Sequence, residues 1–380
     1  MFIAFFSNEP RTQNTAWGGG VVNDWFVHIV GTGTIGVPLI EICSLFRKEF
    51  GLLGVTFSKR CPHAKNLADI RIMQRHGALL AVEEESMQTF CDAGYKPDLT
   101  AAKARSMATV IIDCTPKKSG LAHKEQYYEQ LVADGTCLRA IAQGSEDGFG
   151  PPLASRINNH VLSPENRFIQ VVSCNTHFGA SVTWALTGGH IEDVVDGDFV
   201  YHRRSGDVSQ EDGQQNDVSV DPHKDEVFGT HQARDVARVF ETCGFSSVPL
   251  FSSTSIAPSQ LMHVTRCRIV IRGHLSLEQI LQRLEDSPLI ACTHKRRTGT
   301  SFSFGRDHSL NGRILTPAIV SVLTISIRYS GENTIVVLWG FTSQDGNSLR
   351  SSIAAMLSAP YPEDWQKKIE CLAPYIFQEI

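Results

Sequence analysis

The spacing of apolar residues along the chain changes near its midpoint. Between residues 25 and 172, short continuous apolar runs such as LLGVTF (52–57) and TVIIDCT (109–115) alternate with stretches of helical periodicity. Continuous apolar strands separated by helices are typical of a parallel sheet that helices cover on both faces. This part predicts a doubly wound α/β domain over residues 26–172.

After the apolar run FIQVVSC (168–174), the strands alternate between apolar and polar residues. DFVYHR (198–203), HVTRCRIVI (263–271) and VSVLTISIRY (320–329) show this pattern, and one helical stretch covers 276–284. Such alternation is typical of a mainly antiparallel sheet with helices on one face. It predicts an α+β catalytic domain over 173–340, followed by a helical segment at 341–380 that packs back on the first domain.

Two polar or glycine-containing segments fall outside these patterns. Residues 1–25 include Asn8, Pro10 and the glycines 18–20, and predict an irregular extension to which we assign no chemistry. The segment SGDVSQEDGQQND (205–217) predicts a surface loop.

Composition narrows the class of protein. The chain has 380 residues, 42% of them hydrophobic and 20% charged, which suits two domains with sizeable cores. A net charge of -5 argues against a general binder of nucleic acids or anionic membranes. No run of about 18 apolar residues occurs, so no membrane span is expected.

The ten cysteines occur singly, without C-x-x-C pairs. This spacing fits reduced thiols in a cytoplasmic protein better than a disulfide framework. The apolar residues Met1–Phe6 are too few for a secretory signal. Because no second ligand pair has zinc-site spacing, we expect no metal.

A glycine-rich turn follows the first apolar strand. Gly31, Gly33 and Gly36 form G-x-G-x-x-G, with Thr34 and Ile35 between the last two, directly before a helical pattern. The first glycine permits a tight turn, the second lets the backbone approach a pyrophosphate, and the third lets the helix pack on the strand. The pattern predicts a nicotinamide dinucleotide site, and a plain tight turn is the alternative.

The end of the second strand indicates which dinucleotide is bound. An NAD-specific site usually carries a carboxylate there, but this chain reads Thr56-Phe57-Ser58-Lys59-Arg60. The Ser58 hydroxyl and the Lys59 ammonium suit a 2′-phosphate. We therefore expect NADP to be used at least as well as NAD, with a solvated basic turn as the alternative.

Cys174 is the strongest candidate for covalent chemistry. It ends an apolar strand and begins a helical pattern, and a helix N-terminus stabilises a thiolate. A thiolate attacks an aldehyde to give a thiohemiacetal, and hydride loss then leaves a thioester. Asn175 or backbone amides would stabilise the oxyanion.

The chain resembles the archaeal-type (type II) glyceraldehyde-3-phosphate dehydrogenases from about residue 26 to about residue 358. The matching motifs, in order, are GTGTIG (31–36), DCTP with SG (113–120), QG (143–144), VVSCNT (171–176), RR (203–204) and PSQLMHV (258–264). The resemblance implies a Rossmann domain, a catalytic α+β domain, a C-terminal helix that returns to the first, a homotetramer and the use of NADP or NAD.

The resemblance also implies roles for individual residues. Cys174 is the nucleophile and His263 the base. The loop beside the nicotinamide contains Thr115, Pro116, Gly120, Gln143 and Gly144, and the substrate and its phosphate are bound by Thr176, Arg203, Arg204 and His231.

Three departures from the family pattern leave the activity open. The family's H-x-H reads His263-Val264-Thr265, its double histidine reads His231-Gln232, and His177 replaces a threonine beside the nucleophile. Two alternatives to aldehyde oxidation are a specialised acyl-phosphate or thioester reductase of a biosynthetic pathway and a non-catalytic nucleotide-binding regulatory relative. Lys117 and Lys118 contact either a phosphate or solvent, and the basic run HKRRTG (294–299) fits a solvated loop.

Overall fold

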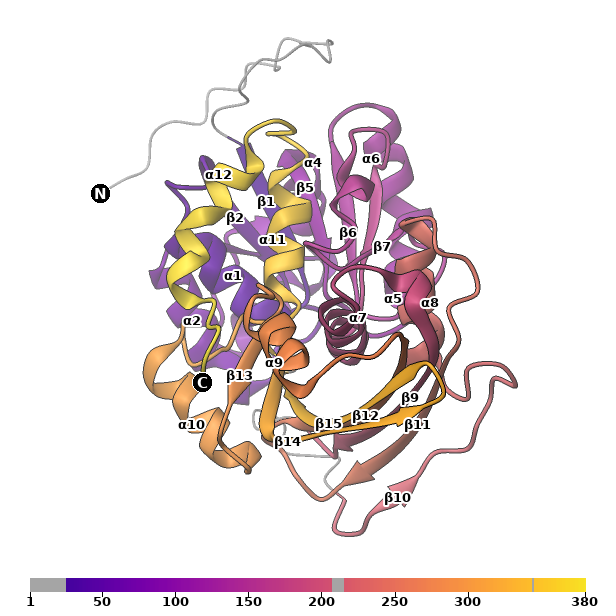
Figure 1. The fold of residues 1–380 in the computed structure, drawn as a ribbon. Helices are drawn as coiled ribbons and strands as arrows, with labels where there is room; N and C mark the ends of the chain where they lie inside the picture. The colour runs from indigo at the N-terminus through magenta and orange to yellow at the C-terminus, as the bar shows by residue number, and fades with distance from the viewer. Residues whose placement is uncertain (1–24, 207–214, 344) are drawn as a thin grey trace.

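The computed structural model describes residues 25–206, 215–343 and 345–380. The predicted extension, except Trp25, lies outside the described residues, as does most of the predicted loop at 205–217. Within the described residues the chain forms two sheets, one from residues 25–171 and one from residues 194–342 (Figure 1).

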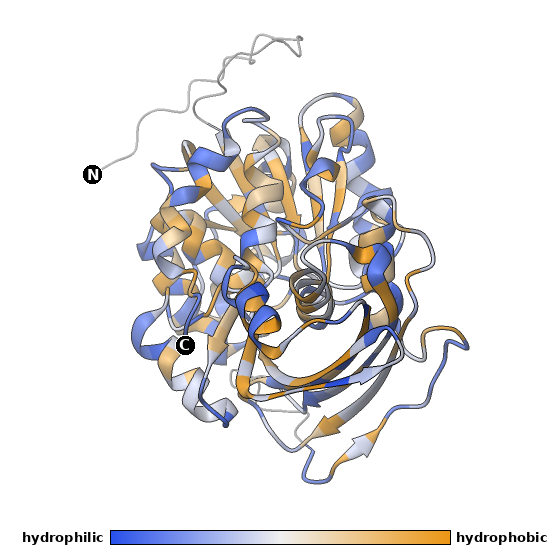
Figure 2. Cartoon of the chain, in the orientation of Figure 1, coloured by the Kyte–Doolittle hydropathy of each residue, from blue (hydrophilic) through white to orange (hydrophobic). Residues whose placement is uncertain are grey.

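The first sheet has eight strands in the order β4-β3-β2-β1-β5-β6-β8-β7, and every pairing in it is parallel. Its central strands are mostly apolar (Figure 2) and buried, as expected of a sheet that is covered on both faces. The predicted α/β class with a Rossmann-type sheet is confirmed. The strands are β1 Trp25–Val30, β2 Leu52–Ser58, β3 Ala78–Val82, β4 Leu99–Thr100, β5 Ala108–Asp113, β6 Arg139–Gln143, β7 Pro152–Leu153 and β8 Phe168–Val171.

Short helices connect these strands, as right-handed parallel crossovers require. They are α1 Gly36–Leu45, α2 Leu67–Arg75, α3 Met87–Asp92, α4 Ala101–Met107, α5 Ser119–His123 and α6 Glu129–Ala133, with a π-helical turn at Lys124–Tyr128 between the last two.

The second sheet has seven strands in the order β10-β11-β9-β12-β15-β14-β13. Four of its pairings are antiparallel, and the β9/β11 and β13/β14 pairings are parallel. The predicted mainly antiparallel sheet is therefore confirmed. The strands are β9 Val194–Arg204, β10 Ser219–Val220, β11 Leu250–Ala257, β12 His263–Arg272, β13 Ile290–Thr293, β14 Ala318–Ser330 and β15 Asn333–Thr342.

One face of the second sheet packs on helices. Alternate residues of β15, such as Val336 and Leu338, are buried, and their neighbours are partly exposed. The covering helices are α7 Cys174–Thr187, α8 His231–Thr242 and α9 Leu277–Glu285. In Figure 1, α7 is seen end-on between the two sheets.

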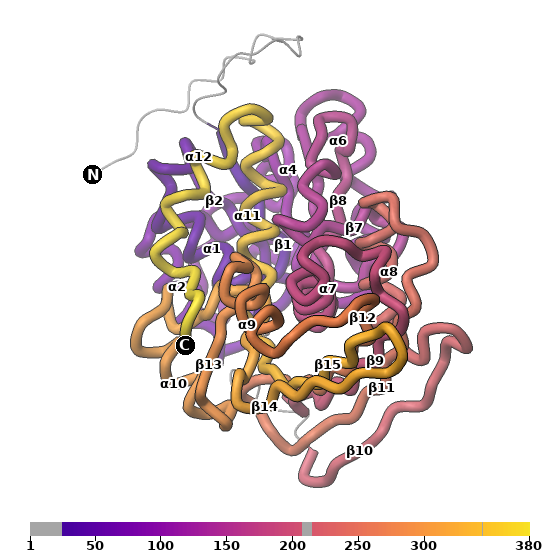
Figure 3. The backbone as a smooth tube through the Cα atoms, in the orientation of Figure 1, coloured from indigo at the N-terminus to yellow at the C-terminus, as the bar shows by residue number. Residues whose placement is uncertain are grey.

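The C-terminal segment returns to the first sheet. All nine residues of α11 (Leu349–Leu357) are buried, and α12 (Trp365–Ile369) follows it. Arg139 of β6 donates hydrogen bonds from Nη1 to the Ala355 carbonyl and to the Ser358 hydroxyl at the end of α11. Figure 3 shows this last segment beside the first strands and helices of the chain. None of the helices in the described ranges is long and apolar enough to cross a bilayer.

Candidate active site

The glycine-rich turn has the geometry that a dinucleotide needs. Gly31 has a φ of +98°, which favours glycine, and a Cβ on Gly36 would lie 2.0 Å from the Gly31 carbonyl oxygen. A Cβ on Gly33 would meet no atom within 4 Å. Gly31 and Gly36 are therefore required by the chain itself, whereas Gly33 leaves open space that a pyrophosphate fits.

The first turn of α1 suits the same anion. Its N-cap residue, Ile35, has no side chain that could accept the turn's backbone N–H groups, and Thr34 precedes it. Amides without a side-chain cap at a helix N-terminus are a ready site for phosphate. The predicted pyrophosphate site is thus compatible with the local structure.

Ser58 and Lys59 lie beside this turn. The Gly31 N–H donates to the Ser58 carbonyl at 3.0 Å, and Lys59 Nζ donates to Thr32 Oγ1 at 3.2 Å and to Asn66 Oδ1 at 3.0 Å. Partial burial lowers the pKa of Lys59. The fold therefore holds an ammonium group next to the glycine turn, where the adenosine end of the dinucleotide would lie.

The predicted nicotinamide loop is fastened by two buried carboxylates. The N–H and hydroxyl of Thr115 both donate to one Asp113 oxygen, while the Gly120 N–H donates to Glu146 Oε1 at 3.3 Å. Burial tends to raise the pKa of Asp113, but hydrogen bonds from His123, Thr115 and Tyr128 bring it below its ordinary value. Pro116 lies between these anchors.

Gln143 is the last residue of β6, and Gly144 follows it. The Gly144 N–H donates to the Val171 carbonyl at 2.9 Å, and Gln143 Oε1 accepts a hydrogen bond from Ser352 of α11. Gly144 is thus bonded to the strand that leads to Cys174, and Gln143 to the C-terminal helix.

Cys174 is the first residue of α7, and the Ser173 side chain caps that helix by accepting from the Thr176 N–H. Burial raises the pKa of the Cys174 thiol to about 11, while the Arg204 charge and backbone N–H groups oppose this shift. The helix N-terminus alone thus leaves the thiol protonated at neutral pH. Nearby positive charge decides how much thiolate forms.

His263 is tied to the same arginine. The backbone N–H of Arg204 donates to His263 Nδ1 at 2.9 Å, and His263 is 4% exposed. Because Nδ1 accepts, a neutral ring carries its proton on Nε2 and can donate from there. Thr265, where the family pattern has a second histidine, is buried opposite Tyr201 of β9.

Four basic side chains form a second group, which we call the cationic cluster: Lys117, Arg203, His231 and Arg234. Burial and then the charges of Lys117, Arg234 and Arg203 lower the pKa of His231 to about 4, while Asp221 opposes them. The ring is therefore uncharged at pH 7, and the other three side chains carry the positive charge of the cluster. His231 is the first residue of α8, so the helix dipole adds to the positive potential. The cluster suits a phosphate dianion.

The adjacent arginines predicted to hold one phosphate thus have different surroundings. Arg203 pairs with Asp221 at 2.7 Å and is about one-third exposed, whereas Arg204 is buried and acts on Cys174. Successive strand residues point to opposite faces, which separates the two side chains.

The other residues around the predicted site are buried. The Thr176 hydroxyl is hydrogen-bonded to Ser173 Oγ within the helix cap, and Gln232 Oε1 accepts from Thr230. Asn175 is also buried, and its Oδ1 has no partner among the described residues. The substrate contact predicted for Thr176 and the oxyanion contact predicted for Asn175 remain predictions.

Sequence reasoning missed several residues that the fold brings to the site. Asn347, which neither pattern nor spacing marks, donates to the Cys174 carbonyl at 2.9 Å. Asp345, whose QD pair at 344–345 also matches the family, raises the pKa of Cys174 through its charge, but no role was predicted for it. Arg234 could have been found, because it lies one helical turn after His231.

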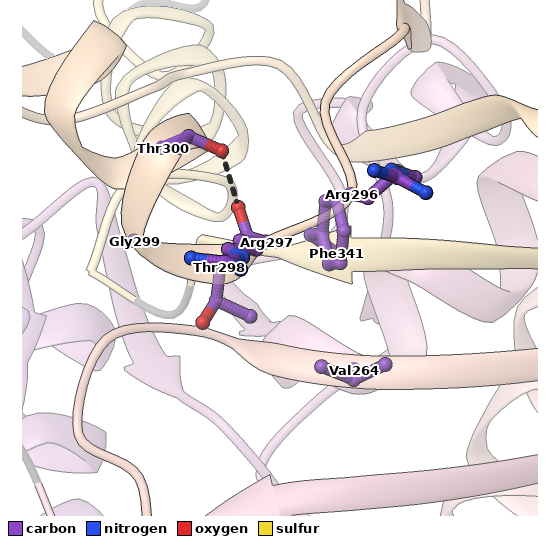
Figure 4. Close-up of a pocket in the computed structure, with 7 residues that line it drawn as sticks. All are labelled: Val264, Arg296, Arg297, Thr298, Gly299, Thr300 and Phe341. Carbon is purple, nitrogen blue, oxygen red and sulfur yellow. Dashed lines mark hydrogen bonds between the residues drawn. The ribbon is translucent and has the colours of Figure 1, made fainter.

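A groove of about 600 Å³ lies beside Val264, the residue that follows His263 (Figure 4). Its lining includes none of the residues predicted for the site. The basic run at 294–299 is only partly a loop, since α10 (Thr298–His308) begins inside it. The groove is lined by Val264, Arg296, Arg297, Thr298, Gly299, Thr300 and Phe341.

Comparison with known proteins supports the resemblance seen in the motifs. The chain is 26% identical over 321 residues to the glyceraldehyde-3-phosphate dehydrogenase of Sulfolobus acidocaldarius, covering 83% of this chain and 86% of that protein. It is 27% identical over 271 residues to the enzyme of the same name from Methanobacterium bryantii, covering 70% and 72% of the two chains. For that of Methanocaldococcus jannaschii the identity is 25% over 297 residues, covering 74% and 79%. The chain matches no protein-family model. Similarity to archaeal glyceraldehyde-3-phosphate dehydrogenases along most of the chain confirms the predicted resemblance.

Proposed function

We propose that the chain is an NAD(P)-dependent dehydrogenase that oxidises a small phosphorylated aldehyde of the glyceraldehyde 3-phosphate type. The similarity to archaeal enzymes of that name supports this activity. The observation that carries the proposal is the arrangement at the start of α7. There the charge of Arg204 lowers the pKa of the Cys174 thiol, and the backbone N–H of Arg204 is hydrogen-bonded to His263.

In the proposed reaction the Cys174 thiolate attacks the aldehyde carbon, so a C–S bond forms and the carbonyl oxygen becomes an alkoxide that takes up a proton. Bound NAD(P) supplies the acceptor for the hydride. Loss of the hydroxyl proton and of the hydride leaves a thioester on Cys174. Phosphate or water then attacks the acyl carbon, and the sulfur leaves as thiolate; with phosphate, the reverse direction reduces the acyl phosphate.

His263 and the first amides of α7 stabilise the alkoxide in this scheme. The ring donates from Nε2, and the Asn175 N–H is a second donor at the helix N-terminus. For the predicted proton transfer, the hydrogen bond from the Arg204 backbone N–H to His263 Nδ1 must first break, because only then can Nδ1 take a proton. The cationic cluster holds the substrate phosphate.

The dinucleotide is held by the glycine turn at its pyrophosphate, by Ser58 and Lys59 at a 2′-phosphate, and by the loop from Thr115 to Gly120 at the nicotinamide. Open space at Gly33 and uncapped amides at Ile35 support this placement. Lys59 supports a preference for NADP, because its ammonium already lies beside the turn.

We expect Lys59→Glu to raise the KM for NADP by about 10- to 100-fold, since it replaces a charge-assisted hydrogen bond by repulsion. The KM for NAD should change little. Steady-state kinetics with both cofactors measure this, with Lys96→Glu as a control of equal charge change on an exposed residue. A uniform loss with both cofactors would show that Lys59 is structural.

The assay that tests the function follows nicotinamide reduction with the purified full chain, glyceraldehyde 3-phosphate, and NADP or NAD, with and without phosphate. Phosphate-dependent reduction is the expected result. Activity only in the reverse direction with another acyl phosphate or thioester would support the specialised reductase. Tight NADP binding without thioester formation from any aldehyde would support the non-catalytic relative.

We further propose a homotetramer in the cytoplasm. All ten cysteines are unpaired in the structure, which suits a reducing compartment. Light scattering after size exclusion measures the assembly, and fractionation of cells measures the compartment.

A further inference from the structure

Two peptide planes flank the Cys174 side chain, and each is held from the side opposite the thiol. The Ser173 carbonyl accepts from the His177 backbone N–H at 2.8 Å and from His177 Nδ1 at 3.1 Å. The Cys174 carbonyl accepts from Asn347 Nδ2 at 2.9 Å. A peptide unit is planar, so fixing its carbonyl also fixes the N–H on its other side. These N–H groups belong to Cys174 and Asn175, the two amides that favour the thiolate.

The hydrogen bonds of His177 leave one arrangement of protons. A carbonyl can only accept, so Nδ1 carries the proton and Nε2 is an acceptor. Ser351 therefore donates its hydroxyl to Nε2 at 2.8 Å, and its oxygen accepts the Ser155 N–H at 3.0 Å. Each polar atom of this chain of bonds has a partner.

The imidazole is also kept neutral. His177 is 1% exposed, and burial lowers its pKa to about 4. The ring bonds the Ser173 carbonyl at Nδ1 and the Ser351 hydroxyl at Nε2, the Val172 backbone also acts on it, and none of these partners is charged. His177 therefore serves as a fixed link rather than as an acid or base.

The hydrogen bonds that fix the two peptide planes both start from the C-terminal segment, at Asn347 and at Ser351. Asn347 lies two residues before α11 and also donates to the Pro317 carbonyl, while Ser351 lies in the first turn of α11. At the other end of α11, Ser358 accepts a hydrogen bond from Arg139, which belongs to β6 of the first sheet. The segment that packs on the cofactor domain thus reaches the nucleophile by two routes.

We propose that α11 orients the amides around Cys174, with His177 as a positioning residue on one route and Asn347 on the other. The inference rests on the proposed function for its catalytic consequence, but the placement of the thiol can be measured without any substrate. It also explains why a histidine can stand at 177: the ring spans the distance from Ser173 to Ser351, which a threonine side chain is too short to do.

The test measures the rate at which uncharged iodoacetamide alkylates Cys174, followed by mass spectrometry of its peptide between pH 7 and 10. His177→Thr and Ser351→Ala should each slow alkylation about tenfold at a given pH and lower kcat by a similar factor, the cost of one such hydrogen bond, with the cofactor KM unchanged. Ser351→Thr keeps the hydroxyl, so its alkylation rate should be close to that of the wild type.

Double variants separate the two routes. Combining His177→Thr with Ser351→Ala should slow alkylation no more than either change alone. Combining His177→Thr with Asn347→Ala should slow it by the product of the two single factors. Ser358→Ala is the matched control, because it removes a buried hydroxyl from the other end of α11 and should leave alkylation unchanged.

These results test the positioning role of His177 and α11 separately from the proposed function. Slower alkylation in the two variants, with rescue by Ser351→Thr, supports the positioning role even if the wild type fails to oxidise glyceraldehyde 3-phosphate. Alkylation at the wild-type rate throughout pH 7 to 10 in variants that remain folded overturns it, whatever the activity. Equal slowing by Ser358→Ala also overturns it, because the effect would then reflect general loosening of α11.

Discussion

Cys174→Ser is expected to reduce the rate of aldehyde oxidation by about 10⁴-fold or more, because no thioester can form at an appreciable rate on a hydroxyl that stays protonated. The cofactor should still bind, since its predicted contacts lie mainly in the turn from Gly31 to Gly36 and beside β2. Rates of nicotinamide reduction and a separate titration of NADPH binding measure the two properties.

The control is Cys91→Ser, which changes an exposed cysteine on α3. It should keep full activity and cofactor affinity. A Cys174→Ser protein that retained a tenth of the wild-type rate would rule out a covalent route, and a variant that lost cofactor binding as well would point to a folding defect.

Arg204→Leu is expected to lower kcat/KM by about 10²- to 10³-fold, the range seen when one electrostatic contact to a reacting centre is removed. Burial already raises the pKa of Cys174 to about 11, and the Arg204 charge opposes that rise. Removing the charge moves the thiol pKa further up, so less thiolate exists at any pH below it. Arg204 also donates through its guanidinium to the Gln260 carbonyl, so the site loses order as well as charge.

The sign of the pH dependence follows from the raised pKa. Below that pKa the thiolate fraction grows about tenfold per pH unit, so alkylation by iodoacetamide should climb steadily from pH 7 to pH 10 in the wild type. In Arg204→Leu the same profile should shift to higher pH. Because iodoacetamide is uncharged, the shift reports on the thiol and not on phosphate binding.

Arg203→Leu is the matched comparison. Arg203 is paired with Asp221 and belongs to the cationic cluster, so its loss should mainly raise the KM for the phosphorylated substrate and leave the alkylation profile unchanged. If both variants change only the substrate KM, the two arginines act together on the phosphate, and the assignment of Arg204 to the thiol is wrong.

The divergence of Arg203 and Arg204 also bears on the departures from the family pattern. Gln232 and Thr265, which stand in place of histidines, are both buried. The Arg204 charge acts on Cys174 and its backbone N–H binds His263, while Lys117, Arg203 and Arg234 act on His231. The chain thus keeps the proposed nucleophile, a hydrogen-bond donor and a group of cations without those two histidines, which favours the proposed catalysis over a purely nucleotide-binding role.

Local patterns in the sequence were sufficient for the elements and for the fold class. The strand-turn-helix around Gly31 to Gly36 and the helix that begins at Cys174 are encoded by neighbouring residues, because hydrophobic period and glycine placement act over a few positions. The same patterns indicated the change from a parallel to a mainly antiparallel sheet. The basic run at 294–299 was only partly a loop, because its polar composition hides the start of α10.

Which side chains meet was decided only by the tertiary structure. The bond between Arg204 and His263 spans 59 positions, and that between His177 and Ser351 spans 174. No local periodicity encodes such contacts, since they depend on how strands pair and on where α11 docks. The sequence by itself determined the nucleophile candidate and its helix, whereas burial and the charges gathered around it decided how readily that thiol ionises and what each neighbouring residue can do.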